Sequence, residues 1–168
     1  PNGDQRIGLG FPDLGQNRSA RAVSMGGAGG CVILDEGSLR CWGQGAGAAA
    51  GMDPTDIDLG QDRVAIAVST GETHTCAILD TEEAVCFGNG DYGRLGNDDD
   101  DYASDPVPVH FEQGTRVVAI GVGERASCAV IGNGSVYCWG QGPLGGGGDS
   151  NTNSSIPVYV DTGGRRAT

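Results

Sequence analysis

Three pairs of cysteines with the same internal spacing constrain this chain more than any other feature. The pairs are Cys31 and Cys41, Cys76 and Cys86, and Cys128 and Cys138. The first cysteines of successive pairs are 45 residues apart (31 to 76) and then 52 residues apart (76 to 128). An aromatic residue and then a glycine follow the second cysteine of every pair. The chain is therefore an internal repeat, and its period is typical of the blades of a β-propeller.

Each cysteine pair flanks a segment that is typical of a β-hairpin. In the third repeat, Cys128–Ile131 and Ser135–Cys138 enclose Gly132-Asn133-Gly134, a turn signal between two apolar runs. The second repeat has Asp80–Glu83 at this place, without a glycine, so its turn is less strongly indicated. These patterns, together with 32 glycines, favour an all-β fold over a helical bundle.

Further strands are predicted on either side of the hairpins. The apolar runs Ala65–Val68 and Val117–Ile120 are typical of strands that are buried on both faces. Pro106–Val109 and Pro157–Val160 lie after the hairpins. Because proline cannot donate to a strand ladder, we expect these two segments to be outer or edge strands.

The repeats divide the chain into a single array that spans residues 1–168. Residues 20–64, 65–116 and 117–168 are the three repeats, and residues 1–19 resemble the tail of a preceding one. The basis for this is Asn2-Gly3-Asp4, which matches Asn89-Gly90-Asp91 of the second repeat. We therefore expect about three repeats plus a half-repeat at the N-terminus.

The spacing of the cysteines predicts three disulfides, Cys31–Cys41, Cys76–Cys86 and Cys128–Cys138. In a hairpin with a central turn, such cysteines lie opposite each other on neighbouring strands, within the range that a disulfide accepts. Zinc usually requires a closer spacing of its cysteines, and buried reduced thiols are the other alternative. Disulfides indicate an oxidising compartment, so we expect an extracellular, cell-surface or periplasmic protein.

The repeats resemble those of the regulator of chromosome condensation family, in its bacterial branch. The best copy runs from Thr73-His74-Thr75-Cys76-Ala77 through Leu95-Gly96 to Pro106-Val107-Pro108-Val109, whereas the first repeat departs from the pattern at Ala46–Gly51. The resemblance implies a β-propeller, commonly of seven blades. Three repeats cannot close such a ring, so we expect a partial or open propeller within this chain.

The charge of the chain argues against several partners. It carries 22 acidic residues and 10 arginines without any lysine, for a net charge of -12. Phosphate backbones and anionic membrane surfaces repel such a chain, so we expect no nucleic acid. No apolar run is long enough for a membrane span. Charged partners would be basic proteins or cations, although acidity can also serve solubility alone.

Acidic loops between the repeats are candidate calcium ligands, because calcium takes six to eight hard oxygens. The densest group is Asp98, Asp99, Asp100, Asp101 and Asp105, with further groups at Asp53, Asp56 and Asp58, and at Asp149, Asn151 and Asn153. The spacing matches no EF-hand, and solvated acidic loops are the commoner explanation. We expect no other cofactor.

Two sets of residues are candidates for binding or catalysis. Trp42, Phe87 and Trp139 recur at one position of the repeat, where they could form a binding surface or, as we favour, pack between blades. His74 could activate Cys76 as a nucleophile. Since Cys76 is expected to be disulfide-bonded, we expect no catalytic residue and no enzyme.

These features predict a non-catalytic, secreted or surface-displayed propeller module for protein–protein recognition or assembly. The resemblance implies protein recognition as well, since relatives include a nuclear guanine-nucleotide exchange factor and secreted bacterial inhibitors of β-lactamases. One alternative is a structural subunit that self-associates head to tail into a homo-oligomer or extracellular filament. A further alternative is an exchange factor, or a regulatory domain attached to an enzyme.

Overall fold

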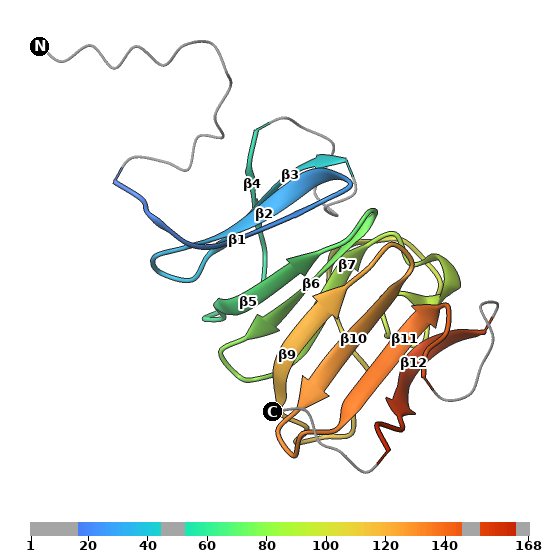
Figure 1. Cartoon of the computed structure of the whole chain (residues 1–168). Coiled ribbons are helices and arrows are strands. Elements are labelled where there is room, and N and C mark those ends of the chain that lie inside the picture. The colour runs from blue at the N-terminus through green and yellow to red at the C-terminus, as the bar shows by residue number, and fades with distance from the viewer. Residues whose placement is uncertain (1–16, 45–52, 146–151, 164–168) are drawn as a thin grey trace, which may run out of the picture.

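The chain folds into three four-stranded antiparallel sheets, each a blade of a β-propeller (Figure 1). This computed structural model describes residues 17–44, 53–145 and 152–163. Strands follow one another in chain order within every blade, so each blade is a meander of hairpins. The all-β fold class and the propeller architecture are those that the repeat predicts.

The strands of the three blades have the following bounds. Blade 1 contains β1 (Ala20–Gly26), β2 (Ala28–Leu34), β3 (Leu39–Gln44) and β4 (Thr55–Ile57). Blade 2 contains β5 (Ala65–Thr70), β6 (His74–Leu79), β7 (Ala84–Gly88) and β8 (Ala103–Pro108), with the short 3-10 helix η1 (Asp91–Gly93) between β7 and β8. Blade 3 contains β9 (Val117–Val122), β10 (Ala126–Ile131), β11 (Val136–Gln141) and β12 (Asn153–Val160).

The central hairpin of every blade turns through a residue in the left-handed conformation. Gly37 and Gly134 have φ of 88° and 85° there, and Glu82 has φ of 64°. The left-handed region is sterically costly for residues with a Cβ, which explains glycine in two of the repeats. The second repeat forms the same turn with Glu82, so the missing glycine does not change the hairpin.

The blades stack on one another along their first strands, and the hydrophobic core lies between them. Strands β1, β5 and β9 contact each other in that order. One core joins blades 1 and 2 around Ile33, Leu39 and Phe87, and a second joins blades 2 and 3 around Ile78, Leu95 and Trp139. Since each blade buries its faces against a neighbour, the residues at the two ends of the array have a different environment from those inside it.

The first strands differ from the prediction that they are buried on both faces. A β-bulge lies at the same place in each first strand, at Arg21, Ile66 and Val118. Ile66 and Val118 are 54% and 53% exposed as a result. A bulged residue has no partner on the neighbouring strand, so its side chain leaves the inter-blade core.

The proline-containing segments form the outer strands, as predicted. Pro106 and Pro108 lie in β8 and Pro157 lies in β12, and both strands pair on one side only. An edge strand without the full set of N–H donors is a poor template for pairing with a further strand.

All six cysteines are paired in disulfides, in the combination that the spacing predicts. Cys31–Cys41, Cys76–Cys86 and Cys128–Cys138 each join facing residues of the central hairpin, with Cα atoms 4.1, 4.0 and 4.0 Å apart. The first two disulfides are fully buried in the inter-blade cores. These disulfides support an oxidising environment for the protein.

Candidate interaction surfaces

The recurring aromatic residues occupy equivalent positions but differ in exposure. Phe87 packs in the core between blades 1 and 2, Trp139 packs in the core between blades 2 and 3, and both are fully buried. Trp42 is only half-buried on blade 1. Two of the three residues are therefore inter-blade packing residues, and Trp42 belongs to the outward face of blade 1.

The outward face of blade 1 is apolar. Val23 and Met25 lie on it beside Trp42, because the strand register places Met25, Gly30 and Trp42 in one row. Their side chains are 65% and 63% exposed. Their equivalents in blade 2, Val68 and Thr70, are partly or fully buried. We call Val23, Met25 and Trp42 the blade 1 end face.

The opposite end of the array also presents an apolar face. The register of blade 3 aligns the Cys128–Cys138 disulfide with Val158, and aligns Val130 with Val136 and Val160. All four valines are half-buried. The equivalent residues of blade 2 include Cys76, Ile78, Ala84 and Cys86, which blade 3 covers. We call these residues of blade 3 the blade 3 end face.

A buried polar network joins blades 2 and 3. His74 is fully buried, and its Nε2 lies 2.8 Å from Oγ of Ser127. Ser127 donates to the backbone carbonyl of Arg94 at 3.2 Å, and Trp139 Nε1 donates to the same carbonyl at 3.0 Å. Since the Ser127 proton is engaged, His74 donates from Nε2 and its Nδ1 is left without a partner among the described residues.

This network has no geometry for catalysis. Burial lowers the pKa of His74 to about 3, and the Arg94 guanidinium adds to the shift. His74 is thus neutral at physiological pH, and Cys76 is bonded to Cys86 rather than available as a nucleophile. Ser127 is 1% exposed, so no substrate reaches the His74–Ser127 pair. Its role is to connect two blades.

Arg94 anchors the loop between β7 and β8 against blade 3. Its guanidinium donates to the carbonyl of Asp91 at 2.8 Å, to Thr73 Oγ1 at 2.6 Å and to the carbonyl of Glu124 at 3.4 Å. Burial lowers the pKa of this guanidinium. A buried charge with three hydrogen bonds to different segments holds the loop against blade 3.

The acidic loops do not converge on a metal site among the described residues. No group of three or more histidine, cysteine, aspartate or glutamate side chains could hold an ion there. Asp99 Oδ1 accepts from the backbone N–H groups of Asp100 and Asp101, and Asp98 accepts from Ser155. Asp105 is exposed on β8. These carboxylates therefore shape their own loop, and calcium binding stays a sequence-based prediction.

The two other acidic groups are only partly described. Asp56 forms an ion pair with Arg40 at 2.6 Å, and Asp58 accepts from the backbone N–H of Gly60. Asp53 is exposed, and Asn153 begins the edge strand β12. Asp149 and Asn151 lie outside the described residues.

A groove between blades 2 and 3 was not foreseen from the sequence. It has a volume of about 630 Å³ and lies between the connection 110–116 and blade 3. Phe111, Ile131, Tyr137 and Pro157 are among its lining residues. The signal that could have indicated it is a difference between repeats: Phe111 and Tyr137 stand where the preceding repeat has Leu59 and Val85.

Comparison with known families and structures agrees with this geometry. Residues 86–130 match the Regulator of chromosome condensation (RCC1) repeat, and residues 65–94 match a second description of the same repeat. These two matches cover residues 65–130, from blade 2 into blade 3, and they agree with the family that the sequence resembles. None of the curated proteins compared with the chain matches it.

Solved propellers share this fold. Human WBSCR16 superposes with a TM-score of 0.74 at 24% identity, covering 85% of this chain and 38% of its own. Yeast RCC1 (Prp20) bound to Kap60 superposes with a TM-score of 0.70 at 18% identity, covering 86% of this chain and 38% of its own. Prp20p from Saccharomyces cerevisiae superposes with a TM-score of 0.69 at 18% identity, covering 86% of this chain and 39% of its own. The chain spans about two fifths of the length of these proteins.

No helix in the described part of the chain combines the length and the apolar character that crossing a membrane requires.

Proposed function

We propose that this chain is a non-catalytic propeller module of a secreted or surface-displayed bacterial protein, and that it recognises other proteins. The observation that carries the proposal is the propeller fold, and within the described array its blade 1 end face has Val23 and Met25 65% and 63% exposed. Contiguous exposed apolar side chains mark protein–protein contacts. The three disulfides support the oxidising compartment.

The structural neighbours support a role in protein binding. Yeast RCC1 was solved in complex with Kap60, and Prp20p is described with binding properties to Gsp1p and histones. Both structures concern the same yeast propeller, which thus has several protein partners. The net charge of -12 favours a basic partner for the present chain.

Affinity capture with covalent cross-linking tests this proposal. The unreduced chain is incubated with the extracellular proteins of its source, and a Val23→Ser/Met25→Ser variant serves as the matched comparison. We expect one partner to cross-link in a fixed ratio to the unchanged chain, and its yield to fall with the variant. Equal yields for the two chains would show that the blade 1 end face is not the site of contact.

Self-association is the second candidate, because the two end faces resemble the faces of a blade interface. Trp42 on blade 1 corresponds to Trp139, which blade 3 presents to blade 2. The blade 3 end face carries a disulfide, as does the face of blade 2 that blade 3 covers. Contacts of this kind between copies are heterologous, and they build either rings or filaments.

The native mass of the unreduced protein separates these candidates. A discrete mass in light scattering, independent of concentration, supports a recognition module or a closed ring. A mass that increases with concentration without a defined stoichiometry supports the filament.

Nucleotide exchange is a third candidate, favoured only by the RCC1-type repeat. It predicts that the chain accelerates the release of labelled GDP from a small GTPase, and an unchanged release rate would exclude it for the GTPase tested.

A further inference from the structure

The groove between blades 2 and 3 has a chemistry that the proposed function does not yet use. Its walls are the connection 110–116, the hairpin turn of blade 3 near Asn133, and the outer strands of that blade, where Tyr137 and Pro157 lie. All of these residues belong to the described part of the chain. With about 630 Å³, the groove has room for several side chains of a ligand.

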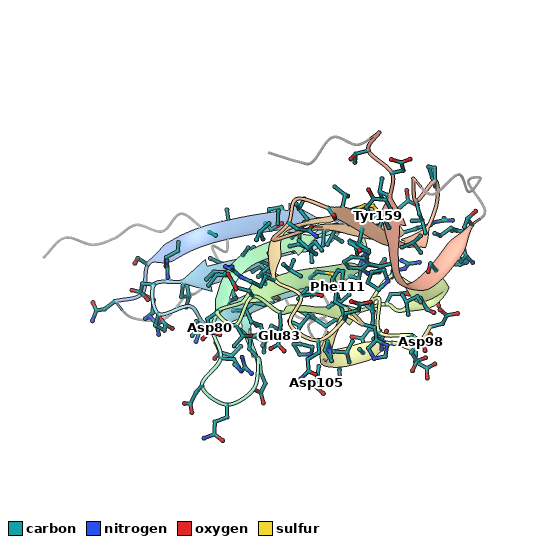
Figure 2. All side chains as sticks on the ribbon, turned by 90° about the horizontal axis from the view of Figure 1, so that it is seen from below. Asp80, Glu83, Asp98, Asp105, Phe111 and Tyr159 are labelled. Atoms are coloured by element: carbon teal, nitrogen blue, oxygen red, sulfur yellow. A yellow bond between two sulfur atoms is a disulfide. The ribbon has the colours of Figure 1, made fainter. Side chains whose placement is uncertain are left out.

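Aromatic rings form a ladder from the core to the surface; Phe111 and Tyr137 line this groove, and Tyr159 lies beside it against Tyr137. Trp139 is buried, Phe111 packs edge-to-face on it at 5.9 Å, and Tyr137 packs on Phe111 at 5.7 Å. Tyr159 continues the ladder at 5.8 Å from Tyr137 and is 49% exposed. Figure 2 shows Phe111 between the ribbons of blades 2 and 3 and Tyr159 on blade 3. The ladder therefore offers an aromatic surface to a ligand.

The ladder is particular to this interface. At the interface between blades 1 and 2, Leu59, Val85 and Pro108 stand at the places of Phe111, Tyr137 and Tyr159. Blade stacking thus does not require aromatic rings at these positions. The rings supply a flat, polarisable surface, and the stacking of the blades does not explain why they are present.

Charge at the groove favours a cation. Arg116 is engaged by both carboxylate oxygens of Glu82, which neutralises the positive charge of the lining. Glu112 is exposed and has no ion-pair partner among the described residues. Glu83, on the other side of the same connection, pairs with Arg63 at 3.6 Å. Among the described residues, the unpaired charge at this connection is therefore the negative charge of Glu112.

The geometry points to the groove as the binding site for an extended peptide that carries an arginine beside apolar residues. This inference rests on the proposed function and names the class of partner. The guanidinium pairs with Glu112 and stacks on the Tyr159 ring, since arginine combines bidentate pairing with cation–π contact. The neighbouring apolar residue, proline or leucine, packs on Phe111 and Ile131, as extended proline-containing segments pack on aromatic grooves.

The test is a titration of the unreduced chain with a fluorescein-labelled peptide, Gly-Ser-Pro-Leu-Arg-Pro-Ser-Gly, followed by anisotropy. A second peptide with glutamine in place of arginine is the ligand control. We expect saturable binding of the arginine peptide, and affinity weaker by about twofold to fivefold for the glutamine peptide, the range of an exposed ion pair. Equal affinity for the two peptides would overturn the inference.

Matched variants locate the contact. Glu112→Gln should weaken the affinity for the arginine peptide by about twofold to fivefold and leave the affinity for the glutamine peptide unchanged. Asp105→Asn removes the same charge from β8, outside the groove, and should leave both affinities unchanged. An equal loss with Asp105→Asn would mean that the net charge, rather than the groove, attracts the peptide, and would overturn the inference.

The aromatic contribution is tested at the exposed end of the ladder. Tyr159→Ser should weaken the affinity for the arginine peptide. Tyr159→Phe keeps the ring and should bind the peptide as the unchanged chain does. If Tyr159→Ser also binds normally, the ladder is not part of the site. If the captured partner of the proposed function still cross-links while no peptide binds here, the module recognises proteins elsewhere and only the groove is excluded.

Discussion

The two blade interfaces share a backbone arrangement but are filled with different chemistry. Ser24 Oγ accepts from the backbone N–H of Thr70 between blades 1 and 2, and Ser69 Oγ accepts from that of Val122 between blades 2 and 3. A disulfide sulfur also lies near a hydroxyl in both, Cys31 near Thr75 at 3.8 Å and Cys76 near Ser127 at 3.7 Å. These contacts recur because the repeat recurs.

The difference lies in the side chains that fill the space. Between blades 2 and 3, His74, Ser127, Trp139 and the carbonyl of Arg94 form a connected network. Between blades 1 and 2, Gly29 and Thr75 stand at the places of His74 and Ser127, and Phe87 has no N–H to donate. Two blades can thus stack with either an apolar or a polar filling of side chains between them. The polar filling is the more demanding one, because an unpaired buried group is costly and Nδ1 of His74 has no partner among the described residues.

Truncation of the buried aromatic residues should have the largest effect on stability. Phe87→Ala and Trp139→Ala should each lower the free energy of unfolding by about 3–5 kcal/mol, through lost burial and the cavity left behind. Trp139→Phe should cost about 1–3 kcal/mol, since it removes the indole N–H that donates to the Arg94 carbonyl. Urea unfolding of the unreduced protein measures all three. If Trp139→Phe matched the unchanged chain, the network would contribute nothing beyond packing.

Acid should distinguish the interfaces through His74. The folded-state pKa of His74 is about 3 and the ordinary value is 6.5, so the unfolded chain takes up a proton first as the pH falls. This loss of stability begins below about pH 6.5 and reaches on the order of 3 kcal/mol by pH 4. His74→Gln keeps a donor for Ser127 but does not titrate. The stability difference between pH 7 and pH 4 should therefore be smaller in this variant, and an equal difference would contradict the buried neutral histidine.

The shared serine contacts should have intermediate and similar effects. Ser24→Ala and Ser69→Ala each leave a backbone N–H between blades without its acceptor, at a cost of about 1 kcal/mol. Equal losses would show that the two interfaces use this contact in the same way. If only Ser69→Ala lowered the stability, the serine contact would contribute only at the more polar interface, between blades 2 and 3.

The ion pair between the blades should matter least. Burial of the Glu82 carboxylate is minor, and its hydrogen bonds from Arg116 lower its pKa. Glu82→Gln should reduce stability less than either serine variant, and the reduction should vanish in about 1 M salt, which screens exposed charges. Lowering the pH through the depressed pKa of Glu82 removes the same contribution. A loss that persists in high salt would mean that packing rather than charge is involved.

Local patterns of the sequence predicted the frame of this protein well. The cysteine spacing predicted the hairpins and disulfides, and Pro106 and Pro157 marked outer strands because the physical constraint is carried by the residue itself. The blade-like period, together with the resemblance, predicted the propeller. These features depend on residues that are neighbours along the chain or across one hairpin.

Features set by a neighbouring blade were not predictable in the same way. His74 and Ser127 meet across 53 residues, and no local pattern signals that contact. Trp42 and Trp139 have the same sequence context but different exposure, because only Trp139 has a described blade packed over it. Ile66 looked like a core residue and is exposed, since the alternation of the strand does not reveal its bulge. The groove near Phe111 depends on three segments that come together only after folding.

The short disulfides have a mechanical consequence. Each closes a hairpin with a sequence separation of 10, and all six cysteines are used, so no covalent cross-link joins one blade to the next. Under tension applied to its two ends, the chain should separate between blades first. Each disulfide then prevents roughly 30 Å of chain, the length of its closed loop, from extending. A reductant would release that length, so the extension of the stretched chain would report the redox state of its surroundings.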